Sequence, residues 1–128
     1  MALPDALKST TPAEINITIC QGETYLALYQ FQNAGANIDL TGCTATAKVK
    51  DTFTGTTLAT FVCTIPSPTD GTVRIALTPA TTTALTATFP SASTRDVVFG
   101  VWDFEVTDGT DTIRGAQGTA TLSREVTT

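Results

Sequence analysis

The chain has 128 residues, of which 41% are hydrophobic and 15% charged, and its formal net charge is −5. This length allows one domain with a single core, and the composition excludes an intrinsically disordered chain. Seven lysines and arginines are too few for a phosphate-binding surface, and no apolar run is long enough to cross a bilayer. We therefore expect neither nucleic acid nor membrane as a partner.

The start of the chain predicts an extended arm. Residues 1–13 contain two prolines and show no periodicity, whereas residues 14–128 predict a β-sandwich domain. Leu3 and Leu7 are spaced to lie on one side of a helical turn that begins at Pro4. We expect the arm to be disordered in the free protein and to order against a neighbouring subunit; a frayed terminus with no role is the alternative. Because residues 1–8 lack the features of a signal peptide, we expect a cytoplasmic protein.

Alternation of apolar and polar residues predicts about eight strands. In the second of them, Tyr25, Tyr29 and Phe31 share one parity and two leucines share the other, so both of its faces are expected to be covered, one of them by a neighbour. Thr78 and Pro79 predict a short helix over residues 80–87. The predicted strands cover residues 15–19, 24–32, 43–51, 58–65, 72–77, 97–107, 111–116 and 118–124.

These elements predict an all-β fold, an antiparallel Greek-key sandwich of immunoglobulin-like type with one short helix. Trp102, Phe104 and Val106 lie on the most continuous apolar face of the chain, and we predict that they are buried between the sheets. The dipeptide at residues 108–109 is a hairpin signal. Gly115 and Gly118 predict a bulge or close packing, because no strand-to-helix turn surrounds them.

No pattern in the sequence predicts a reaction centre. The chain has no histidine, which excludes a Ser-His-Asp triad and a histidine-bound metal. Asp103 and Glu105 share one side of a strand at a spacing that glycosidases use, but such a pair more often marks the solvated end of a strand. Asp108 and Asp111 fit either a calcium ion or ordinary turn chemistry. We expect no catalytic, cofactor-binding or metal-binding residue, and we leave calcium open.

The cysteines give no disulfide framework. Their number, three, is odd, and no Cys-x-x-Cys spacing occurs, so we expect reduced thiols. Cys43 and Cys63 share parity with apolar neighbours and are expected to be buried. Cys20 falls on the opposite parity from the isoleucines of its strand, so it is expected to be the most exposed.

Several segments, in order and spacing, resemble a family of small β-sandwich modules of tailed bacteriophages. The chain is similar to the N-terminal domain of phage baseplate upper proteins and to stand-alone virion accessory proteins. The resemblance extends over about residues 15–126 and rests on residues 19–23, 38–44, 47–51, 70–77, 102–108 and 118–126. It implies a non-enzymatic particle protein, and it carries over no catalytic residue.

The resemblance leads us to expect a virion structural protein, either a capsid decoration protein or a tail or baseplate accessory subunit. It would be assembled in the host cytoplasm, be present in multiple copies or as a homo-oligomer, and dock on other virion proteins. The expected partner-binding residues are Leu3, Leu7, Tyr25, Tyr29 and Phe31. The alternative is a module that binds carbohydrate or a host surface, which requires exposed aromatic side chains, with Phe53 as a further candidate.

Overall fold

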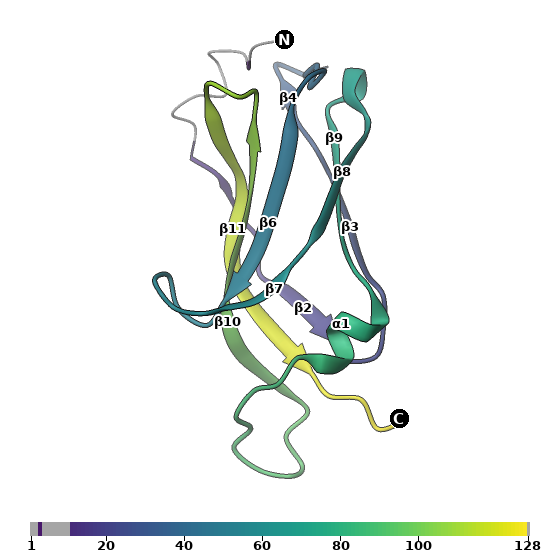
Figure 1. Ribbon diagram of the computed structural model, residues 1–128, viewed down its shortest axis with the longest axis vertical. Coiled ribbons are helices and arrows are strands. Elements are labelled where there is room, and N and C mark those ends of the chain that lie inside the picture. Colours follow the sequence, from purple (N-terminus) through teal and green to yellow (C-terminus); the bar gives the residue numbers. More distant parts are fainter. Residues whose placement is uncertain (1–2, 4–10, 128) are drawn as a thin grey trace.

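Two β-sheets pack face to face in the computed structural model, which describes residue 3 and residues 11–127 (Figure 1). The all-β sandwich predicted from the sequence is confirmed. The described residues form eleven strands, several of them only two residues long, and one short α-helix. This helix has six residues, so no helix in the described part of the chain is long enough to cross a membrane.

Sheet A is built around a long hairpin. Its strands β10 (Asp96–Thr107) and β11 (Thr112–Ser123) are antiparallel, and β6 (Thr44–Lys50) and β7 (Thr57–Thr60) extend the sheet beyond β10. On the other edge, β1 (Ala13–Glu14) and β2 (Ile17–Cys20) both run parallel to β11. Ala13, which we had assigned to the arm, is therefore part of the sheet.

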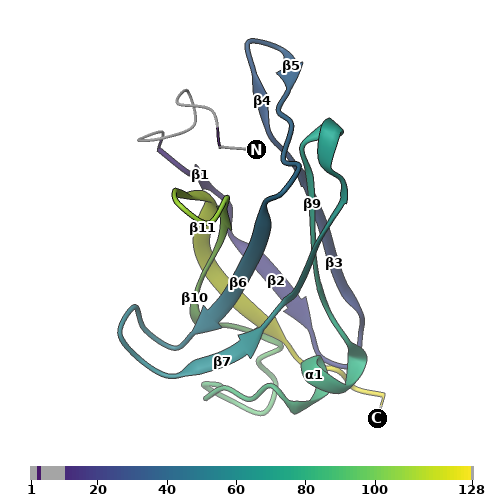
Figure 2. The same cartoon turned by 45° about the horizontal axis from the view of Figure 1, so that its top comes forward.

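Sheet B has three antiparallel strands in the order β3 (Tyr25–Gln30), β9 (Thr72–Leu77) and β8 (Val62–Ser67). A small separate hairpin, β4 (Gln32–Asn33) and β5 (Ala36–Asn37), projects from one end of the sandwich (Figure 2). The 3₁₀ turn η2 (Pro68–Asp70) connects β8 with β9.

The strand order is that of an immunoglobulin-like domain. In the lettering of that fold, β3, β9 and β8 are strands B, E and D, whereas β11, β10 and β6 are strands G, F and C. β7 occupies the position of strand C′. The first strands of this chain pair with β11 and not with β3, so they close the edge of sheet A.

The structure differs from the sequence-based strands in three places. The strand expected at residues 24–32 ends at Gln30, and Gln32 belongs to the small hairpin of β4 and β5. The strand expected at residues 58–65 is broken at Phe61, where the chain passes from sheet A to sheet B and the buried ring fills the corner. The two strands expected at the end of the chain form the single strand β11. Gly115 is an extra residue in β11, because the register with β10 shifts there, and a side chain at this position would overlap the ring of Phe104.

The helix α1 (Pro79–Ala84) begins as predicted. The side chain of Thr78 caps it and accepts a hydrogen bond from the backbone N–H of Thr81 at 3.3 Å. It ends earlier than predicted, at Ala84, and Leu85 follows in extended conformation. The hydroxyl of the buried Thr82 donates to the carbonyl of Glu23 at 2.8 Å, which fixes the helix over the turn between β2 and β3.

The core between the sheets is rich in aromatic rings. Trp102, Phe104 and Val106 are buried as predicted. From sheet B, Tyr29 approaches Phe104 with ring centroids 4.9 Å apart. Phe31, which directly follows β3, contacts the same ring edge-on at 5.9 Å. The indole N–H of Trp102 donates to the carbonyl of Ile15 at 2.7 Å, so the buried ring also anchors the segment between β1 and β2.

Candidate binding faces

The structure places most of the predicted partner-binding residues inside the sandwich. Leu3 is buried, with 2% of its surface exposed, and its backbone N–H donates to Asp108 at 2.7 Å. The prediction that the arm is disordered in the free protein is therefore wrong at this residue. Leu7 lies outside the described residues.

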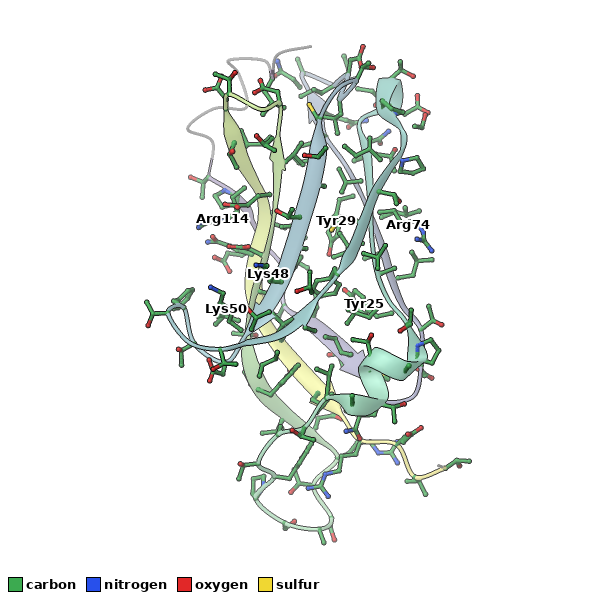
Figure 3. The ribbon with its side chains drawn as sticks, viewed as in Figure 1. Tyr25, Tyr29, Lys48, Lys50, Arg74 and Arg114 are labelled. Carbon is green, nitrogen blue, oxygen red and sulfur yellow. The ribbon has the colours of Figure 1, made fainter. Side chains whose placement is uncertain are left out.

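The prediction that Tyr25, Tyr29 and Phe31 bind a partner is also not supported, because the structure places these rings on the inner side of the sandwich. Tyr25, Tyr29 and Phe31 are half-buried, and the two tyrosines lie between the sheets (Figure 3). Tyr25 contacts the ring of Phe61 with centroids 5.6 Å apart. Burial raises the pKa of both tyrosine hydroxyls above the ordinary value. Large rings fill the space between the sheets better than leucines do, so the leucines of β3 point to solvent.

We call the outward surface of sheet B the apolar face, and we define it by Leu26, Leu28, Val62, Arg74 and Ala76. The first three are 51%, 60% and 56% exposed. The register places Leu26, Ala76 and Val62 in one row across the sheet, and Leu28 beside Arg74 in the next. The alternation in the sequence separated the leucines of β3 from its tyrosines, but it did not show which of the two groups faces the core.

A concavity of 690 Å³ lies on the outward surface of sheet A. Three strands supply most of its floor, in cross-strand rows. One row contains Lys50, Val101 and Thr119, the next contains Lys48, Asp103 and Gln117, and the third contains Thr46, Glu105 and Arg114. Figure 3 shows Lys48, Lys50 and Arg114 on the side of the molecule opposite Arg74.

Hydrogen bonds fix one wall of this concavity. Arg114 lies 3.4 Å from the carboxylate of Asp103 and donates to the side-chain oxygen of Gln117 at 2.9 Å. The amide nitrogen of Gln117 in turn donates to Glu14 at 2.7 Å. This chain of contacts joins β10, β11 and β1, so the wall is ordered before any ligand arrives.

The opposite wall contains an exposed aromatic residue. Phe53 lies in the loop between β6 and β7, which projects outward from sheet A (Figure 2), and 84% of its surface is exposed. The carboxylate of Asp51 closes this loop, because it accepts the backbone N–H groups of Thr52 and Thr56, both at 2.7 Å. Of the four aromatic residues considered for carbohydrate binding, Phe53 alone is strongly exposed.

The carboxylates weighed for catalysis and metal binding have other contacts. Asp103 is paired with Arg114, and Glu105 lies between Thr46 and Arg114 in register. The carboxylate of Asp108 accepts the backbone N–H groups of Thr110 and Asp111, at 2.8 Å and 2.7 Å, as ordinary turn chemistry does. In the described residues, no group of three or more acidic or cysteine side chains is placed to hold a metal ion.

All three cysteines are free thiols of intermediate exposure, so the predicted contrast between Cys20 and the other two is not observed. Burial is the main cause that raises the pKa of each thiol above its ordinary value. Cys43 and Cys63, which were predicted to be buried, are only partly buried and pack against the core. A raised pKa lowers the thiolate fraction at neutral pH, which disfavours a nucleophilic role.

Comparison of the sequence with models of known protein families finds no match, and comparison with curated proteins finds no significant relative.

Proposed function

We propose that the chain is a non-enzymatic structural protein of a tailed-bacteriophage particle and docks on another particle protein through the apolar face. The observation that carries this proposal is the exposure of Leu26, Leu28 and Val62 on one side of sheet B. A fully exposed side chain of this kind contributes roughly 1.5–3 kcal/mol when a partner removes it from water, and each of these three, which are about half exposed, contributes about half of that. A group of exposed apolar side chains on a sheet is typical of a protein interface.

The composition of the apolar face specifies the chemistry of the partner. Arg74 is the only charged residue among the outward positions of β3, β9 and β8, and it lies between Leu28 and Thr64 in register. A guanidinium surrounded by apolar groups is best paired with a carboxylate. The partner is therefore a virion protein with an apolar surface and a carboxylate near its centre, on the capsid or on the tail. Several copies of the chain occupy each particle, which is assembled in the host cytoplasm.

The chain contains a matched pair of residues for testing this face. Val62 on β8 and Val98 on β10 are both strand valines, 56% and 60% exposed, and only Val62 belongs to the apolar face. We expect Val62→Asp to reduce the number of copies per purified particle at least tenfold, because a buried unpaired carboxylate is costly at an interface. Val98→Asp should leave the copy number near wild type. Quantitative mass spectrometry of purified particles measures both.

Three outcomes would contradict the proposal. Equal copy numbers for the two variants would show that this face does not dock. Absence of the wild-type chain from particles would remove the virion role itself. Hydrolysis of a glycan that is lost when Asp103 and Glu105 are replaced by Asn and Gln would show an enzyme.

A further inference from the structure

The concavity on sheet A lies on the opposite side of the molecule from the apolar face, so a ligand there leaves the docking surface uncovered (Figure 3). We propose that it binds an acidic oligosaccharide, with a sugar ring against Phe53 and a carboxylate at Lys48 and Lys50. This inference does not depend on the virion role. The volume of 690 Å³ falls within the range of roughly 300–1,000 Å³ that is usual for ligand sites.

Phe53 is suited to bind the apolar face of a sugar ring. Its side chain is 84% exposed, so a sugar ring that covers it removes apolar surface from water, which favours binding. The loop that presents it is closed by Asp51, whose backbone N–H also donates to the carbonyl of Thr56 at 3.1 Å. A loop that is already ordered loses little conformational entropy on binding.

The two lysines are available to an anion. Neither Lys48 nor Lys50 makes an ion pair with any described residue. The register places Asp103 beside Lys48, but its carboxylate is held by Arg114 on the other side. Alternate residues of a strand lie about 7 Å apart on one face, so both ammonium groups can approach the same carboxylate or adjacent ones.

Among the described residues, the other acidic groups that line the concavity form no ion pair with either lysine. Glu105 lies in the row beside that of Lys48, opposite Thr46 and Arg114, and Glu14 accepts a hydrogen bond from Gln117. Thr119 lies in the same row as Lys50, on the other side of Val101, and its hydroxyl can form hydrogen bonds with the hydroxyl groups of a sugar. The net charge of −5 disfavours a densely charged polymer, whereas a sugar chain with spaced carboxylates is compatible with it.

The test uses the full chain and a panel of uronic-acid and sialic-acid oligosaccharides, each paired with its methyl ester, in isothermal titration calorimetry. At least one acid is expected to bind ten times more tightly than its ester, and more weakly as salt is added. Phe53→Ala should weaken that binding at least tenfold, and so should the double variant Lys48→Gln/Lys50→Gln. Phe53→Tyr should retain it. Circular dichroism confirms that each variant is folded.

Arg74→Gln, on the apolar face, is the control and should change the affinity less than twofold. A tetraglutamate peptide is included to separate carbohydrate recognition from attraction to any acidic chain. The proposal is overturned if no acid in the panel binds, if the acid and its ester bind equally, or if binding survives Phe53→Ala. Peptide binding with the same dependence on Phe53 and the lysines would overturn the assignment to carbohydrate.

Discussion

Thr82 is the one fully buried polar residue in the described part of the chain, and its position explains how the short helix is held. Its hydroxyl donates to the carbonyl of Glu23 at 2.8 Å and lies 3.2 Å from the carbonyl of Pro79. A helix of six residues has little stability of its own, so a contact of this kind with the rest of the protein matters more than helix propensity.

Replacing this hydroxyl tests the contact without changing side-chain volume. We expect Thr82→Val to lower the free energy of unfolding by about 1–3 kcal/mol, because the carbonyl of Glu23 loses its buried donor. Thr83→Val on the same helix is the matched control, since Thr83 is exposed, and its effect should be within about 0.5 kcal/mol. Urea denaturation followed by circular dichroism measures both. Similar effects at the two positions would show that the hydrogen bond contributes nothing.

At the scale of elements, β11 joins the two halves of sheet A, and Gly118 sets how closely the first strands approach it. A side-chain carbon at Gly118 would overlap the carbonyl oxygen of Ile15, which belongs to the backbone and is already held by Trp102. The amide of Ile15 donates to the carbonyl of Gln117 at 2.8 Å. Glycine is therefore required here for close packing and not for a turn.

We expect Gly118→Ala to push the first strands away from β11. Amide hydrogen exchange at Ile15 should become at least tenfold faster, because its hydrogen bond to Gln117 is weakened. The amides of β3 and β9 in sheet B serve as internal controls and should exchange at the wild-type rate. Uniform acceleration in both sheets would indicate global destabilisation, and no change at Ile15 would contradict the packing argument.

For the whole molecule, alternation and turn residues were enough to predict the sandwich, the buried Trp102 and the capped helix. They could not decide which face of β3 is buried, because both of its parities are apolar and only the space between the sheets distinguishes Tyr29 from Leu28. The crossing at Phe61 was missed for a related reason. A continuous alternating run has no signal for the point where it changes sheet.

The two binding faces were less predictable than the fold. Phe53 was recognised as an aromatic candidate, but the concavity also contains residues of β1 and of the β10–β11 hairpin, which are far from Phe53 in sequence. The ion pair between Asp103 and Arg114 depends on the register of the hairpin and on the bulge at Gly115. The alternation of residues along the chain shows neither the register nor the bulge. The three-dimensional structure was therefore needed to see that Asp103 pairs with Arg114 and leaves Lys48 available.

The parallel pairing of β2 with β11 determines how the domain responds to mechanical force. Both strands point toward the same end of the molecule (Figure 1), so tension between residues 11 and 127 pulls them past each other. Their hydrogen bonds are then loaded in shear and must break together, whereas a hairpin pulled open breaks one bond at a time. Single-molecule pulling from these two residues should give a higher unfolding force than pulling from two residues on either side of the turn between β10 and β11. Equal forces in the two experiments would contradict this prediction.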